Sequence, residues 1–141
     1  MNEMNEKIEV FTDGSTYGWN GKLGTVTKIG VGVFIPSLNI RFSRKEDGIS
    51  NNVAEVRAMI RALELLRGRT DPIIIYSDSE LAVRWLNKRK QSKKPHLHKE
   101  LEILYALAAQ CTVEARRIPR DFNVIANDLA GGWNPGDPIG Y

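Results

Sequence analysis

Apolar and polar residues alternate along the first third of the chain in the manner of β-strands. Residues 7–12 alternate and then turn apolar, residues 29–35 alternate Ile and Val with Gly and Phe, and a shorter run surrounds Ile40 and Phe42. Strands show this two-residue period because successive side chains point to opposite faces of a sheet. The Gly-rich segment from Thr16 to Thr27 is expected to be a loop. The segment Pro36-Ser37-Leu38-Asn39, between the last two runs, has the composition of a turn. We therefore expect three consecutive strands that form a meander.

Helical spacing dominates the remainder of the chain. Apolar residues recur at intervals of three to four from about Asn52, which predicts a helix that Gly68 ends. The run Ile73-Ile74-Ile75-Tyr76 is too short for a helix and rich in β-branched side chains, so it predicts a buried central strand. The later elements are predicted as a helix through residues 81–86, a helix over 97–108, a strand over 112–118 and a short helix over about 122–130. The order βββαβααβα is typical of an α/β protein with a mixed sheet and helices on its faces.

Composition limits the class of protein. A chain of 141 residues is expected to form a single domain over residues 1–141, and 42% hydrophobic and 26% charged residues are typical of a globular protein. No apolar run approaches the length of a membrane span, and the first residues have no apolar core of a signal peptide. The single cysteine, Cys111, cannot form an internal disulfide. We expect a cytoplasmic monomer that has no membrane association and no obligatory protein partner.

Positive charge is concentrated in one segment, although the net charge is only +3. Seven Lys or Arg residues and both histidines lie between Arg84 and Lys99, without any Asp or Glu. We call residues 84–99 the basic segment. Such a segment is either a solvated surface or a surface that binds phosphate groups, and its composition does not decide between them.

Three carboxylates stand at positions where they can meet. Asp13 follows the first predicted strand, Asp78 follows the Ile-rich strand, and Glu55 lies in the first turn of the first helix. If the two strands pair in parallel, the three side chains converge, and their repulsion favours bound cations such as Mg²⁺ or Mn²⁺. The structural alternative is capping, in which Asp78 caps the helix that follows and Glu55 forms a capping box with Asn52.

Four motifs in order carry a resemblance to a known family. They are Thr12-Asp13-Gly14-Ser15, Asn51-Asn52-Val53-Ala54-Glu55, Tyr76-Ser77-Asp78-Ser79 and the segment Ile118 to Ala130. With these motifs, the chain resembles the type 1 ribonuclease H family, and the last segment is similar to the archaeal and plant-like branch. The resemblance implies a ribonuclease H-like mixed five-stranded sheet, with three antiparallel strands plus parallel strands, flanked by helices. It also implies an endonuclease that cuts the RNA strand of RNA/DNA hybrids with two Mg²⁺ or Mn²⁺ ions, leaving 5′-phosphate and 3′-hydroxyl ends.

The resemblance also implies the residues of the site. The catalytic and metal-binding residues would be Asp13, Glu55, Asp78 and Asn127, and the substrate-binding residues Gly14, Ser15, Asn51, Asn52, Ser79 and Arg120.

The fourth metal-binding position departs from the family pattern, Asn-x-x-Ala-Asp-x-Leu-Ala. A gap-free alignment through Asn123 and Ala126 places Asn127 where the family has Asp, and Asp128 comes one residue late. One residue rotates a helix by about 100°, so Asp128 is expected to point away from the site. An Asn offers a carbonyl oxygen but no charge, which should weaken metal binding and reduce activity or favour Mn²⁺.

Two further departures concern groups around the site. Many family members have a mobile His before the last helix, whereas this chain has Arg116, Arg117 and Arg120 in that region. Glu80 stands where the family has a Gln-like polar group. Two alternatives to the hydrolase therefore remain: a nucleic-acid-binding module with weak or no turnover, and a related nuclease or junction-cleaving enzyme of the same fold.

Overall fold

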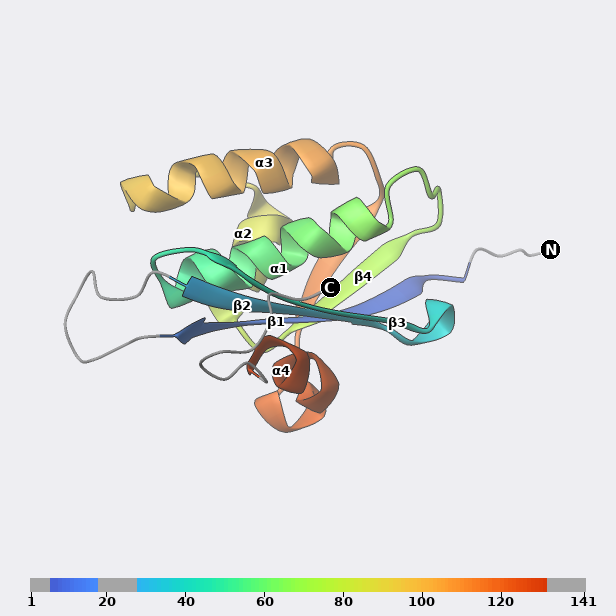
Figure 1. Cartoon of the computed structure of the whole chain (residues 1–141). Coiled ribbons are helices and arrows are strands. Elements are labelled where there is room, and N and C mark those ends of the chain that lie inside the picture. The colour runs from blue at the N-terminus through green and yellow to red at the C-terminus, as the bar shows by residue number, and fades with distance from the viewer. Residues whose placement is uncertain (1–5, 18–27, 132–141) are drawn as a thin grey trace.

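Five strands form one mixed sheet in the computed structural model, which describes residues 6–17 and 28–131 (Figure 1). The strands are β1 (Ile8–Tyr17), β2 (Lys28–Ile35), β3 (Ile40–Asp47), β4 (Ile73–Ser77) and β5 (Val113–Arg117), in the spatial order β3-β2-β1-β4-β5. The first three pair antiparallel, and β4 pairs parallel with both β1 and β5. The predicted fold class, a mixed five-stranded sheet of this kind, is confirmed.

Helices cover both faces of the sheet. The helices α1 (Asn51–Leu65), α2 (Glu80–Lys88) and α3 (His98–Ala108) lie on one face and α4 (Val124–Gly131) on the other (Figure 1). Short 3₁₀ turns are η1 (Pro36–Leu38), η2 (Pro95–Leu97) and η3 (Arg120–Phe122). The predicted order of strands and helices is confirmed, and the main core lies between the sheet and α1 and α3, with Val10, Ile75, Met59 and Leu104 fully buried. Within the described ranges, no helix is both long enough and apolar enough to cross a membrane.

The first strand is longer than the sequence predicts. Asp13 does not lie at a strand end, because β1 continues to Tyr17, and the loop expected over residues 16–27 begins later than predicted. The pairing with β4 stops at Phe11, but β2 remains paired with β1 from Phe11 to Tyr17, so the backbone hydrogen bonds of the ladder continue. Residues 18–27 of that predicted loop lie outside the described ranges. Asp13 is thus held in a central strand, just beyond the point where its neighbour β4 ends.

The third strand is also longer than predicted, since it extends from Ile40 to Asp47 along the whole length of β2. Its second half is charged, Arg44-Lys45-Glu46-Asp47, and has no apolar alternation. The strand persists there because β2 supplies a continuous backbone partner.

Two glycines bring helices close to the central strands. A Cβ atom on Gly14 would lie 2.3 Å from the carbonyl carbon of Ala54, and a Cβ on Gly32 would lie 2.3 Å from the carbonyl oxygen of Ala126. Real Cβ atoms do not approach backbone so closely, so only glycine allows α1 to lie against β1 and α4 against β2. Gly32 is paired with Asp13 across the ladder, which places α4 beside Asp13.

Hydroxyl groups from the sheet hold the carboxyl end of α4. Ser15 Oγ and Tyr17 Oη donate to the carbonyl oxygen of Ala130 at 2.7 and 2.8 Å, and Ser43 Oγ donates to that of Leu129 at 2.5 Å. The last carbonyl groups of a helix have no partners within the helix, so these side chains satisfy them. They fix α4 across β1 and β3.

Candidate active site

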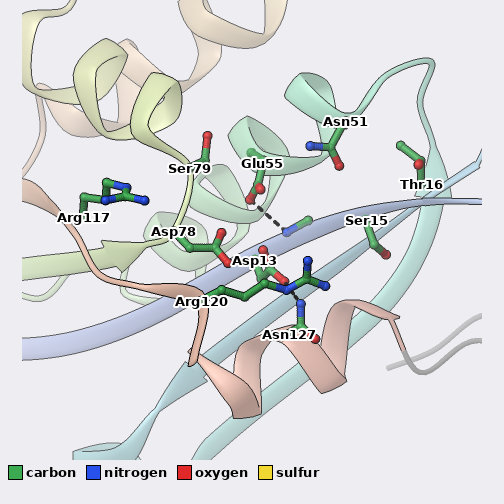
Figure 2. A pocket seen from close by; sticks show the side chains of 11 residues that line it. Asp13, Ser15, Thr16, Asn51, Glu55, Asp78, Ser79, Arg117, Arg120 and Asn127 are labelled. Carbon is green, nitrogen blue, oxygen red and sulfur yellow. Dashed lines mark hydrogen bonds between the residues drawn. The ribbon is translucent and has the colours of Figure 1, made fainter. Parts of the chain in front are cut away.

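An open cavity of about 540 Å³ lies where β4 ends beside the middle of β1 (Figure 2). Its lining residues are Asp13, Gly14, Ser15, Thr16, Asn51, Glu55, Asp78, Ser79, Arg117, Arg120 and Asn127. The structure therefore brings together all four predicted metal-binding residues and five of the six predicted substrate-binding residues. Asn52 is the exception, because it does not line the cavity.

Three carboxylates from three elements converge in this cavity. Asp13 comes from β1, Glu55 from α1 and Asp78 from the segment after β4, and one carboxylate oxygen of each lies within 4.8 Å of the others. Asp13 and Glu55 are 3% and 6% exposed. The parallel pairing of β1 with β4 produces this convergence, as the sequence analysis expected.

The capping role considered for Glu55 is wrong. The side chain that caps α1 is Ser50, whose Oγ accepts a hydrogen bond from the backbone N–H of Val53 at 3.1 Å. Glu55 Oε1 instead accepts from the backbone N–H of Gly14 at 3.0 Å (Figure 2). The helix starts earlier than Asn52, so Glu55 is too far along it to return to the cap. The carboxylate is fixed against β1 by the same close approach that Gly14 permits.

The capping role considered for Asp78 is also wrong, because the adjacent Ser79 caps α2. Ser79 Oγ accepts from the backbone N–H of Ala82 at 3.2 Å. Asp78 therefore does not cap the helix, and its partly buried side chain lines the cavity.

Asn127 lies beside Asp13, and Asp128 does not. The side-chain amide of Asn127 donates to Asp13 Oδ2 at 2.7 Å, whereas Asp128 is exposed and does not line the cavity (Figure 2). This is the placement that the gap-free alignment predicts. The buried Asn123 supports it, since its amide donates to the carbonyl oxygen of Thr12 at 2.9 Å and so ties the start of α4 to β1. This structural role of Asn123 was not predicted, because the motif marks the residue only as a fixed position in the family pattern.

Burial and mutual repulsion make it unfavourable for all three carboxylates to be ionised at once. Burial, followed by the charge of Asp78, raises the pKa of Asp13 to about 6, against the opposing effects of the Asn127 hydrogen bond and of the positive charge of Arg120. Burial and the charges of Asp13 and Asp78 raise the pKa of Glu55 well above its usual value. A divalent cation would compensate for both effects, and oxygen ligands of this kind suit Mg²⁺ or Mn²⁺. The donor set therefore fits the metal that the sequence analysis expected.

The ribonuclease H family model matches residues 5–124. The chain belongs to the ribonuclease H family. This assigns it to the ribonuclease H hydrolases, as the sequence motifs predicted. The match ends before Asn127, so the assignment of the fourth position depends on the geometry of α4 and on the motif alignment.

Solved ribonucleases H have the same fold. LC11-RNase H1, solved in complex with an RNA/DNA hybrid, is 30% identical with a TM-score of 0.74, over 89% of this chain and 95% of that one. The N-terminal RNase H domain of rv2228c from Mycobacterium tuberculosis is 27% identical with a TM-score of 0.67, over 89% and 93%. RNase H1 of Halobacterium salinarum NRC-1, at 23% identity and a TM-score of 0.70 over 89% and 95%, agrees in fold. None of the curated proteins compared matches this sequence.

The region of the mobile histidine found in many ribonucleases H is occupied here by arginines. Arg117 and Arg120 both line the cavity, and neither His96 nor His98 does. Arg116 does not line it either, and its guanidinium instead contacts Glu114 at 3.3 Å. Arg120 was predicted as a substrate contact, but the sequence does not distinguish the position of Arg117 from that of Arg116.

Proposed function

We propose that the protein hydrolyses the RNA strand of RNA/DNA hybrids endonucleolytically and leaves 5′-phosphate and 3′-hydroxyl ends. The observation that carries the proposal is the convergence of Asp13, Glu55 and Asp78 within 4.8 Å in an open cavity. Membership of the ribonuclease H family and the similarity to LC11-RNase H1, which was solved with such a hybrid, support the choice of substrate.

The residues that would hold two Mg²⁺ or Mn²⁺ ions are the three carboxylates and Asn127. When bound, two such ions activate a water molecule and stabilise the leaving oxygen in phosphodiester hydrolysis. Asp13 is central in this arrangement, because the charge of Asp78 raises its pKa and Asn127 donates a hydrogen bond to it. Asn127 presents its amide nitrogen to Asp13 and would have to turn its amide to offer its oxygen to a cation.

Other residues of the cavity would hold the hybrid. Asn51 is exposed at the start of α1, where its amide can reach sugar hydroxyls and base edges. Ser79 uses its oxygen to cap α2, and its O–H donates to no group in the described part of the chain, so it can donate to a phosphate. Ser15 already donates to Ala130, so its hydroxyl contributes to the substrate only as an acceptor. Arg120 supplies positive charge close to Asp13.

Asn127→Asp is expected to lower the Mg²⁺ concentration for half-maximal cleavage by about tenfold and to raise the rate at limiting metal, because added ligand charge strengthens binding of a divalent cation. In metal-free protein, the same change should lower stability at neutral pH, since it replaces the hydrogen bond to Asp13 by repulsion. The measurement is cleavage of a labelled RNA/DNA hybrid over a series of Mg²⁺ and Mn²⁺ concentrations.

Asp128→Ala is the matched control on the same helix, and it should leave cleavage unchanged. If Asp128→Ala alone abolished activity, the assignment of the fourth position to Asn127 would be wrong. If neither the natural protein nor Asn127→Asp cleaved any hybrid, a nucleic-acid-binding module would be the better description. Competition by double-stranded RNA and by DNA would expose a related nuclease with a different substrate.

The basic segment is proposed as a second contact with the hybrid. It begins on α2, whose first residue follows Asp78 and Ser79 of the cavity, and continues through η2 to Lys99 in the first turn of α3. Within it, Lys88, Lys90 and Lys93 are exposed and border one shared hollow. Substrate phosphates that extend beyond the cavity along α2 would meet these side chains.

Replacing Lys88, Lys90 and Lys93 together with Ala is expected to raise the Michaelis constant at moderate salt and to leave kcat unchanged. Each lost phosphate contact should reduce the slope of log affinity against log salt by about 0.9 for a duplex. Steady-state cleavage at several salt concentrations measures both quantities.

The control removes the same number of charges at the other end of the sheet. Lys7, Arg67 and Arg69 are exposed near the starts of β1 and β4, far from the carboxyl end where the cavity lies. Their replacement by Ala should change neither the Michaelis constant nor its salt dependence. Equal effects of the two triple variants would make the basic segment a solvated surface.

A further inference from the structure

Two neighbouring arginines at the end of β5 have opposite surroundings. Arg117 is the last residue of β5, where it is in register with Ser77, and the backbone N–H of Ile118 donates to the Ser77 carbonyl at 3.0 Å. Because side chains alternate along a strand, Arg116 and Arg117 point to opposite faces of the sheet. Arg116 meets Glu114 on its own face, whereas Arg117 lines the carboxylate cavity. In Figure 2, Arg117 lies at the left of the cavity, and Asp78 lies between it and Asp13.

The guanidinium of Arg117 has no protein partner within residues 6–17 and 28–131. It is exposed and forms no hydrogen bond or ion pair there, although three carboxylates line the same cavity. Arg57, in contrast, is paired with Glu100 at 2.8 Å and with Glu46 at 2.7 Å. All donors of the Arg117 fork therefore remain available to a ligand that enters the cavity.

The position of Arg117 in the cavity limits what that ligand group can be. The positive charge of Arg120 acts on Asp13. Arg117 lies on the other side of Asp78 (Figure 2). An anion that spans the carboxylate cluster would therefore meet Arg120 near Asp13 and Arg117 near Asp78 and Ser79. A nucleic-acid strand places one phosphate after another along such a path, and the guanidinium fork matches phosphate oxygens with two parallel hydrogen bonds.

We propose that Arg117 binds the phosphate of the RNA strand that is next to the one being hydrolysed, on the side of the cavity lined by Asp78 and Ser79. The proposal rests on the proposed function, since it takes the hydrolysed phosphate to lie over the three carboxylates. Arg117 is then a positioning residue, which fixes the register of the RNA strand. Its contact is the same before and during hydrolysis, so it affects the Michaelis constant and not kcat.

The test compares Arg117→Ala with Arg116→Ala, its neighbour on the same strand. Arg117→Ala should raise the Michaelis constant for a hybrid about tenfold, as expected for one charge-assisted contact, and change kcat less than about twofold. It should also reduce the slope of log affinity against log salt by about 0.9. Arg116→Ala should alter none of these values, and a thermal melt should show both variants folded.

A hybrid with one uncharged methylphosphonate linkage identifies the phosphate. When it is placed in the RNA strand next to a mapped cleavage site, the neutral linkage should weaken binding by the natural protein about tenfold. It should weaken binding by Arg117→Ala much less, because that variant has already lost the contact. The same linkage in the DNA strand should weaken the binding of both proteins equally. Equal penalties for both proteins at every RNA position, or a fall in kcat alone, would overturn the proposal.

Binding measured without cleavage separates this inference from the proposed function. Fluorescence anisotropy with a labelled hybrid in Ca²⁺ reports affinity whether or not the protein hydrolyses the strand. Weaker binding by Arg117→Ala in a protein that never cleaves would keep the phosphate contact and reject the hydrolase. Normal cleavage with the same affinity in Arg117→Ala as in the natural protein would keep the hydrolase and reject the contact.

Discussion

Replacing Asp13 with Asn is expected to reduce hydrolysis of an RNA/DNA hybrid at least about a thousandfold, since loss of metal-centred charge stabilisation is worth several kcal/mol. Asp13 is the carboxylate that joins the site together. It is held in the central strand, 3% exposed, within 4.8 Å of ligand oxygens on Glu55 and Asp78, and hydrogen-bonded to Asn127. An Asn has nearly the same shape and removes only the charge, so the fold should remain.

The same substitution should stabilise the metal-free protein above pH 6. Burial and the charge of Asp78 raise the pKa of Asp13 from 3.8 to about 6 in the folded state. A raised carboxyl pKa means that the folded protein binds the proton more tightly than the unfolded chain, so stability rises as the pH falls through 6 towards 3.8. At most about 3 kcal/mol is involved. In a chelator, the natural protein should therefore melt at a higher temperature at pH 5.5 than at pH 8, and Asp13→Asn should show a smaller difference.

Asp128→Asn is the matched control, because it makes the same chemical change at an exposed position of α4 that does not line the cavity. It should affect neither cleavage nor the pH dependence of the melt. Turnover by Asp13→Asn within tenfold of the natural rate would show that the carboxylate cluster is not the catalytic centre. A lower melting temperature for Asp13→Asn at pH 8 would show that burial does not penalise this charge.

Local patterns predicted the elements of this fold but not the continuation of its strands. The Ile-rich β4 and the apolar repeat of α1 were recognisable because each is a regular sequence pattern. The length of β1 was not, since its residues beyond Asp13 remain extended only because β2 is paired with them. A strand that depends on its neighbour carries no signal of its own in the sequence.

The candidate site was predicted by residue type and motif order, and the capping alternatives failed for a physical reason. Ser50 and Ser79 are as suited to capping as Asn52 and Asp78. A shift of one or two residues in the start of the helix decides which side chain caps it. The role of Gly14 in bringing Glu55 to β1 depends on a contact between residues 41 positions apart. Arg117 could not be separated from Arg116 because the face that each residue occupies depends on the register of β5.

Ion pairs between distant residues were not predictable from the sequence either. The pairs that Glu46 forms with Arg57 and Arg61 lead to a second expected result. Glu46→Gln should lower the free energy of unfolding by about 2–3 kcal/mol, because it removes the charge of a carboxylate that is hydrogen-bonded to two arginines. Glu46 lies near the end of β3 with its side chain only 7% exposed. Its carboxylate accepts hydrogen bonds from Arg57 at 2.7 Å and from Arg61 at 2.7 and 2.8 Å, which tie α1 to the edge strand.

The pKa of Glu46 reflects the same interaction. Burial alone would raise that pKa, but the hydrogen bonds from Arg61 and Arg57 lower it from 4.5 to about 2. A lowered carboxyl pKa stabilises the folded protein above pH 4.5, and the contribution is lost as the pH falls towards 2. The change corresponds to about 3 kcal/mol, in agreement with the expected loss in Glu46→Gln.

Urea unfolding of Glu46→Gln and of Glu64→Gln at pH 7 and pH 3 tests this interpretation. Glu64 bonds to the same Arg61 at 2.6 Å, but its side chain is 38% exposed, so its removal should cost less than about 1 kcal/mol. The difference between the natural protein and Glu46→Gln should shrink at pH 3, because Glu46 is then mostly protonated in the unfolded chain, where its pKa is the usual 4.5, but still ionised in the folded protein. Equal losses in the two variants would mean that burial adds nothing to the Glu46 pairs.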